Sequence, residues 1–174
     1  GEKVMNFTLR PWQMTDASVI APYADDPLVA QNLRDVFPNP YTVADAEEFI
    51  RSCMEREGQG QMCRAIVADG KAVGSISLVL GSDVYRRSAE LGYWLGRPFW
   101  RRGIMTAAVR EMCALGFETW EILRIHAEPY AGNAGSRGVL EKAGFTLEGI
   151  LRNSVCKNGE ILDSCVYAKL KGEP

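Results

Sequence analysis

Residues 96–106 read Gly96-Arg97-Pro98-Phe99-Trp100-Arg101-Arg102-Gly103-Ile104-Met105-Thr106. They join a strand-like stretch, 89–95, to the longest helical pattern of the chain, 104–119. The start of a helix exposes unpaired backbone N–H groups and carries about half a positive charge. Gly103 has no side chain to block an anion there, and the two preceding arginines add positive charge. This construction suits a phosphate or diphosphate group.

The loop lacks the patterns of two common phosphate-binding loops. No Gly-Lys-Ser/Thr follows it, which excludes a P-loop, and the three-glycine spacing of dinucleotide-binding folds is missing. An Arg-Arg-Gly turn before a helix is also compatible with a solvated turn that binds nothing. On these residues alone, both interpretations stay open.

Hydrophobic periodicity and turn signals on both sides of the loop predict a single sheet with helices packed on it. Strands are predicted at 7–10, 65–68, 72–80, 89–95, 123–128 and on both sides of Asn158-Gly159. Helices are predicted after Thr15-Asp16, after the capping box Thr42–Asp45, at 104–119 and at 136–142. The alternation of strands and helices predicts a mixed α/β layered fold in one domain, residues 1–174.

Composition and charge narrow the class of protein. The chain has 174 residues, of which 47% are hydrophobic and 24% charged, as in globular domains. Its formal net charge is −2, so we expect neither nucleic acid nor an anionic membrane as a partner. No apolar run approaches the ~20 residues of a membrane span, and residues 1–7 show no apolar core of a secretory leader.

The five cysteines and the single histidine indicate neither a disulfide framework nor a metal site. The number of cysteines is odd, and no Cys-x-x-Cys pair occurs. We expect small buried hydrophobic side chains in a reducing cytoplasm. His126 lies in a strand-like stretch, where a packing or surface role is expected rather than catalysis. No metal is therefore predicted.

Two further motifs accompany the loop. Asn133 and Ser136 form an Asn-x-x-Ser pattern, and after a short helix the chain continues with a Gly-Phe-x-x-Glu-Gly pattern, 144–149. Together with 100–105, these motifs resemble the GNAT superfamily of acyl-CoA-dependent N-acetyltransferases. The resemblance is strongest to the branch that acetylates the N-termini of ribosomal proteins (the RimJ/RimL type). Pro40-Tyr41-Thr42 and Asp163 also resemble this branch, so the similarity extends over about the whole chain.

The resemblance implies a three-layer fold with a mostly antiparallel, seven-stranded sheet in which two central strands splay apart. It implies acetyl-CoA as the acyl donor, with the pantetheine arm between those strands. The implied cofactor-binding residues are Trp94, Leu95, Trp100, Arg101, Arg102, Gly103, Ile104, Met105, Thr106, Asn133 and Ser136. Trp100 and Met105 depart from the family's pattern, which favours Gln/Arg and Gly/Ala, so backbone donors and the two arginines must hold the phosphates.

Acetyl transfer requires a neutral amine and a proton for the departing thiolate. Ser136 is the candidate proton donor, with Asn133 holding the pantetheine amide; Ser136 could equally serve as a helix N-cap. Glu90 is the candidate base, directly or through a water; the alternative is an exposed carboxylate paired with Arg86 or Arg87. Some relatives place a carboxylate at the position of Val155, where this chain has none.

The acceptor is predicted from acid–base arithmetic. Deprotonating a lysine at pH 7 costs roughly 4.6 kcal/mol, whereas an α-amino group costs only about 1 kcal/mol. A chain without a strong dedicated base therefore suits a protein or peptide N-terminus. The loop 32–41 is the expected acceptor site, with Asn32, Phe37 and Tyr41 as contacts, although both aromatic residues could instead pack in the core.

Three other hypotheses stay open. The acceptor could be a small amine such as a polyamine or an antibiotic, but few acids lie near the loop: Asp25, Asp26 and Asp35. The chain could bind acyl-CoA without turnover, since Val155 replaces a carboxylate. It could also be an unrelated ATP-binding domain. The sequence is compatible with a monomer and with a homodimer.

Overall fold

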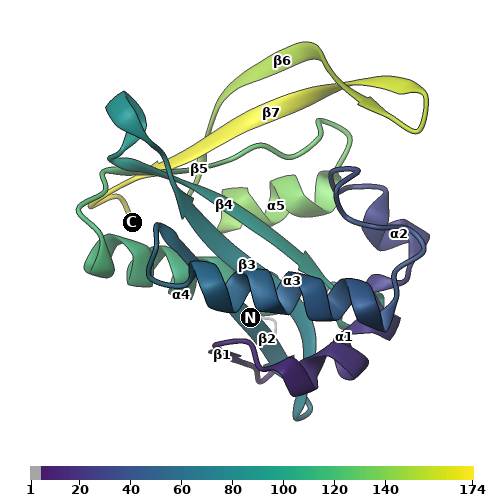
Figure 1. Ribbon diagram of the computed structural model, residues 1–174. Coiled ribbons are helices and arrows are strands. Elements are labelled where there is room, and N and C mark those ends of the chain that lie inside the picture. Colours follow the sequence, from purple (N-terminus) through teal and green to yellow (C-terminus); the bar gives the residue numbers. More distant parts are fainter. Residues whose placement is uncertain (1–4) are drawn as a thin grey trace.

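A seven-stranded sheet forms the centre of the molecule (Figure 1). The computed structural model describes residues 5–174; residues 1–4, within the stretch where no secretory leader is expected, lie outside the described residues. The strand order is β1-β2-β3-β4-β5-β7-β6, and every neighbouring pair except β4–β5 is antiparallel. The bounds are β1 Thr8–Arg10, β2 Gln61–Ala68, β3 Lys71–Leu80, β4 Ser88–Leu95, β5 Arg124–Ala127, β6 Thr146–Lys157 and β7 Glu160–Leu170. The predicted sheet is thereby confirmed.

Helices cover both faces of the sheet. Their bounds are α1 Ala17–Ala24, α2 Pro27–Ala30, α3 Val43–Arg56, α4 Ile104–Thr119 and α5 Ala134–Lys142. The single turn α2 was not predicted, because four residues are too short for a periodic pattern, and α5 begins two residues earlier than expected. Among the helices of residues 5–174, none combines the length and the apolar character needed to cross a membrane.

Two hydrophobic cores lie on opposite faces of the sheet. In β2, Cys63 and Ala65 pack with α1 and α3, whereas Ile66 and Ala68 belong to the core beneath α4 and α5. Figure 1 shows α3 crossing in front of the strands, on the face opposite α4. A strand buried on both faces reads as a nearly continuous apolar run, as Ala65 to Ala68 does.

Local sequence sets the hairpins. Asp69-Gly70 and Asn158-Gly159 all have positive φ, between 52° and 78°, as a two-residue hairpin turn requires. These turns place β2 beside β3 and β6 beside β7, in the predicted antiparallel pairs. Both turns agree with the sequence because asparagine, aspartate and glycine adopt this conformation most readily.

β4 and β5 part after a short parallel contact. Ser88–Glu90 pair with Arg124–His126, and no strand pairs with 91–95 on this side anywhere in residues 5–174. β5 ends before Pro129, which has no N–H to donate to a ladder. The chain then joins β7: the Pro129 carbonyl accepts from the Cys165 N–H at 2.8 Å, and the Ala131 N–H donates to the Asp163 carbonyl at 2.8 Å. This turn toward β7 opens the sheet beside β4.

The cysteines behave largely as hydrophobic residues. Four are buried, namely Cys53, Cys63, Cys113 and Cys165, as predicted. Cys156 on β6 is exposed.

Thr42→Ala should destabilise the protein by about 1 kcal/mol. The Thr42 hydroxyl accepts from the Asp45 N–H at 3.2 Å, and the Asp45 carboxylate accepts from the Thr42 N–H at 2.8 Å, which caps α3. Urea unfolding measures the change. Glu48→Ala, at an exposed position of the same helix, is the control and should change stability by less than about 0.5 kcal/mol. Equal effects of the two substitutions would contradict the capping role.

Candidate active site

At the opening beside β5, residues 91–95 of β4 have no strand partner among residues 5–174. The Gly96 N–H donates to the Val73 carbonyl at 2.7 Å, so alternate residues of β4, Trp94 among them, direct their backbone toward β3. Tyr93 and Leu95 therefore face the opening. Trp100 adds a restraint here, because its indole N–H donates to the Leu95 carbonyl at 2.6 Å. Of the two predicted strand residues, Leu95 has the orientation that a paired pantetheine arm requires.

The loop before α4 has the geometry of an anion-binding helix start. Gly103 is the N-cap residue of α4 with φ 76°, and Arg101 also has a positive φ of 60°. The side chains of Ile104 and Met105 are 0% and 8% exposed and belong to the core. These two residues can therefore offer only backbone N–H groups to a ligand, while Arg101 and Arg102 lie exposed beside them.

Asn133, and not Ser136, caps helix α5. The Asn133 side-chain oxygen accepts from the Ser136 N–H at 3.1 Å, so the N-cap interpretation of Ser136 is wrong. The Ser136 hydroxyl lies 2.6 Å from the Tyr93 hydroxyl. Ser136 is thus held at the opening by a strand that precedes it by 43 residues.

Tyr93 is a polar residue of the site that sequence reasoning missed. Burial raises the pKa of Tyr93 to about 12, against the opposing effect of the Ser136 hydrogen bond. The phenol therefore stays protonated well above neutral pH and can donate a hydrogen bond. The sequence signal was the alternation of side chains between the two faces of β4. It places Tyr93 on the α4 side and Glu90 on the α3 side.

Glu90 is paired with Arg34. One carboxylate oxygen accepts from the Arg34 guanidinium at 2.8 Å, and the Glu90 side chain is 39% exposed. The expected alternative, a pair with Arg86 or Arg87, is wrong: these side chains donate to the carbonyls of Asp83 and Glu121. The partner comes from the segment between α2 and α3 because that segment folds over β4.

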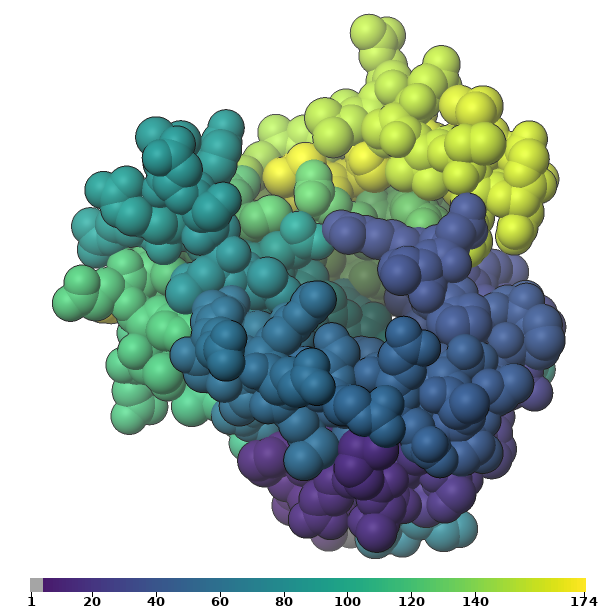
Figure 2. Space-filling view, in the orientation of Figure 1, coloured from purple at the N-terminus to yellow at the C-terminus, as the bar shows by residue number. Residues whose placement is uncertain are grey.

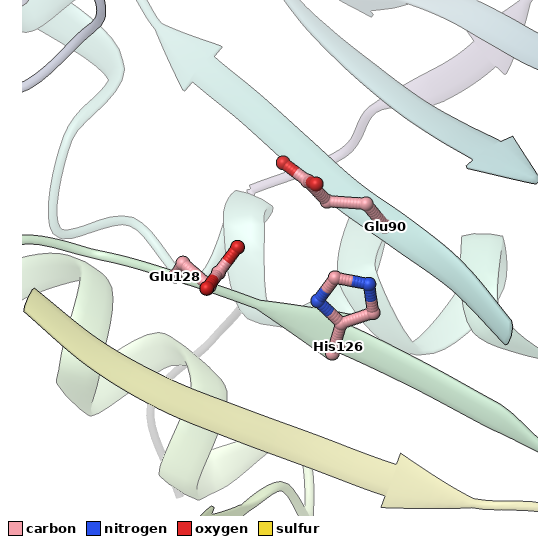
Figure 3. A group of neighbouring side chains, drawn as sticks. All are labelled: Glu90, His126 and Glu128. Carbon is pink, nitrogen blue, oxygen red and sulfur yellow. The ribbon is translucent and has the colours of Figure 1, made fainter. Parts of the chain in front are cut away.

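His126 and Glu128 lie beside Glu90 (Figure 3). One imidazole nitrogen and one oxygen from each carboxylate all lie within 4.8 Å of one another. Glu90 is the register partner of His126 across the β4–β5 contact, and Glu128 follows His126 by two residues. The spacing of two residues between His126 and Glu128 along an extended chain was the sequence signal that their side chains share one face. Only the pairing of β5 with β4 brings that face to Glu90.

A cavity of about 400 Å³ adjoins this cluster. It is lined by Arg34 and Asp35, by Glu128 and Tyr130, and by residues of the β6–β7 hairpin: Leu151, Ser154, Val155, Cys156, Lys157 and Ser164. Figure 2 shows a hollow between the segment that precedes α3 and the hairpin. Val155 of β6 lines the cavity. The acidic residues in the cavity wall, Asp35 and Glu128, lie outside the β6–β7 hairpin.

Three contacts tie the segment between α2 and α3 across the cavity. Arg34 pairs with Glu90, Asp35 accepts from Lys157 at 2.8 Å, and the Leu33 carbonyl accepts from the Tyr130 hydroxyl at 3.0 Å. The segment thus lies between β4 and the hairpin.

The three predicted acceptor contacts, Asn32, Phe37 and Tyr41, do not form the wall of this cavity. Tyr41 is only 6% exposed, and burial raises its pKa to about 12. Phe37 packs on Tyr41 and Trp94 with ring centroids 4.9 and 5.5 Å away. Neither residue lines the cavity, and nor does Asn32. The neighbouring Arg34 and Asp35 do.

A family comparison identifies this architecture. The model of the Acetyltransferase (GNAT) domain matches residues 6–146. The chain belongs to the GNAT acetyltransferase family. It is therefore an acyltransferase, and its acyl donor is acetyl-CoA, as the sequence predicted. The anion-binding loop before α4 and the opened backbone of β4 fit the diphosphate and the arm of this donor.

Two named relatives and one solved structure are similar to this chain. The chain is 30% identical over 170 residues to "Uncharacterized N-acetyltransferase p20" of Bacillus licheniformis, covering 95% of this chain and 93% of that one. It is 39% identical over 108 residues to "Putative ribosomal N-acetyltransferase YdaF" of Bacillus subtilis, which spans 62% of this chain and 58% of YdaF. A solved structure of RimJ from Mycobacterium smegmatis in complex with CoA-disulfide is similar at a TM-score of 0.85, with 25% identity, covering 95% and 82% of the chains.

Gly103→Asp should weaken CoA binding by about tenfold or more beyond the effect of Gly103→Asn. Both residues tolerate the left-handed backbone at this position, so the pair differs mainly by one negative charge next to the expected diphosphate. Isothermal titration calorimetry with CoA measures both affinities. Equal losses would show that no phosphate lies at the start of α4.

Proposed function

We propose that this GNAT acetyltransferase transfers an acetyl group directly from acetyl-CoA to the α-amino group of a protein or peptide. The arrangement of the opening supports this: the candidate donor loop lies before α4, and the cavity lies on the other side, beside Glu90. An amine entering from the cavity would meet the thioester between the parted strands. Such an arrangement allows attack within one ternary complex.

The charges in the cavity wall favour a peptide over a polyamine. Arg34 and Lys157 line it together with Asp35 and Glu128, so two cations face two acids. A polyamine carries several positive charges and would be repelled by the two cations. A peptide presents one ammonium group followed by carbonyl oxygens, which can accept hydrogen bonds from both. The name of YdaF, a putative ribosomal N-acetyltransferase, is in keeping with a protein acceptor.

Ser136 and Asn133 are proposed to act on the donor side. The Ser136 hydroxyl, in contact with Tyr93, would supply a proton or hydrogen bond to the departing thiolate. Asn133 orders the start of α5 and so fixes Ser136. Both hydroxyls lie on the α4 side, whereas Glu90 faces the α3 side, so leaving group and amine would approach from opposite faces.

Ser136→Ala should lower kcat by about tenfold or more, because a sole proton donor contributes ~10²–10⁴-fold and Tyr93 stays in place. The dissociation constant for CoA should change little, since the substitution removes an interaction formed as the thiolate departs. Ser18→Ala, on an exposed position of α1, is the control. If Ser136→Ala raises the CoA dissociation constant and leaves kcat unchanged, Ser136 contributes to CoA binding alone.

The acceptor is tested by thiol release from acetyl-CoA across three groups of amines: peptides with free α-amino groups, polyamines and aminoglycosides. We expect kcat/KM to be highest for the peptides and to vary with their first residues. Blocking the peptide α-amino group while leaving a lysine free should abolish turnover. Higher kcat/KM for a polyamine or an aminoglycoside would overturn the proposed acceptor, and CoA binding without turnover on any amine would overturn the enzyme's proposed reaction.

A further inference from the structure

His126 lies where the opening between β4 and β5 meets the acceptor cavity (Figure 3). Its imidazole and the carboxylates of Glu90 and Glu128 have polar atoms within 4.8 Å of one another. Glu90 and His126 are both of intermediate burial, and Glu128 is exposed. Glu128 also lines the cavity, so the three side chains run from the opening to solvent.

The charged neighbours of His126 come from several elements. Glu90 projects from β4 and holds Arg34 of the segment between α2 and α3 at 2.8 Å. On β5, Arg124 pairs with Glu148 of β6, and Glu128 makes no ion pair with any residue in 5–174. On β7, the register partner of His126 is Ala168, which carries no charge. His126 therefore faces one carboxylate held by an arginine and one that is not.

We propose that His126 accepts the proton of the arriving ammonium group, that Glu128 passes this proton to solvent, and that Glu90, held by Arg34, positions the imidazole. The proposal rests on acetyl transfer to an amine at this opening. It replaces the packing or surface role expected for His126 and makes Glu90 a positioning residue instead of the base. Imidazole is closer in basicity to an α-amino group than a carboxylate is, which makes transfer in either direction easy.

The protons and bonds balance over the reaction. The ammonium gives one proton to the free nitrogen of His126, and the neutral amine attacks the thioester carbonyl. A C–N bond forms and the carbonyl becomes an oxyanion, which collapses and breaks the C–S bond. The second proton on nitrogen goes to the departing thiolate, by way of solvent or Ser136, to give free CoA thiol. His126 returns its proton to water through Glu128.

His126→Gln tests the role, because glutamine keeps a hydrogen-bonding side chain and cannot carry the proton. We expect kcat/KM at pH 7 to fall by about fivefold, the factor that corresponds to the ~1 kcal/mol needed to deprotonate an α-amino group at this pH. The deficit should shrink to less than about twofold at pH 9.5, since most α-amino groups are then already neutral. Arg124→Gln, two residues away on the same strand, is the matched control and should keep the wild-type pH profile. Thermal unfolding and CoA affinity of both variants should match the wild type.

Two further variants separate proton transfer from packing. His126→Ala should recover activity when free imidazole is added, and Arg124→Gln should not respond to imidazole. Glu90→Gln should lose less kcat/KM at pH 7 than His126→Gln, because it removes a positioning contact. A larger loss for Glu90→Gln, with no imidazole rescue of His126→Ala, would return the base role to Glu90.

Other outcomes would overturn the proposal in distinct ways. A deficit of His126→Gln that is constant from pH 6.5 to 9.5 would show a structural role only. Activity abolished by EDTA and restored by Zn²⁺ would assign the cluster to a metal ion. The assays use whichever amine the wild-type enzyme acetylates fastest, so failure of the peptide acceptor leaves this test intact. Absence of turnover on every amine would overturn both proposals.

Discussion

The parting of β4 and β5 is the constraint on which the site depends. β5 contributes only four residues, and the chain beyond it forms hydrogen bonds to β7 from Pro129 and Ala131. Backbone groups of β4 near Tyr93 and Leu95 are left without a strand partner in the described chain, and apart from the Leu95 carbonyl, which accepts from Trp100, they are costly unless a ligand or water satisfies them. In the proposed donor site, the amides of a pantetheine arm would do so.

The opening has two chemically different faces because β4 alternates. Tyr93 turns toward α5 and reaches Ser136, while Glu90 turns toward the α2–α3 segment and reaches Arg34. The face toward α5 is thus a place for hydroxyl donors, and the other face is a place for charged groups. In the proposed reaction, separation by one strand would keep proton donation to sulfur apart from proton removal at nitrogen.

The α2–α3 segment is held over the cavity by few contacts. Arg34–Glu90 is an exposed ion pair, and such pairs contribute only about 0–1 kcal/mol, whereas the side chain of Lys157 in the pair with Asp35 is only 9% exposed. The Arg34–Glu90 contact can therefore be exchanged at small cost, whereas loss of the Asp35 contact would leave a buried charge unpaired. In the proposed reaction, an incoming ammonium would compete with Arg34 for Glu90, which would couple acceptor entry to the position of the segment.

The sequence by itself determined the elements whose cause is local. The capping box at Thr42, the hairpin turns at Asp69-Gly70 and Asn158-Gly159, and the limits of α4 follow from residues within a few positions of one another. The residues around Gly103 favoured a phosphate-binding helix start for the same reason, and only the resemblance to the GNAT family implied the donor. Only the tertiary structure decided the pairs Arg34–Glu90 and Tyr93–Ser136, which lie 56 and 43 residues apart, and the approach of His126 to Glu90. Such contacts depend on strand register and on where a connecting segment crosses the sheet, and neither leaves a periodic signal in the chain.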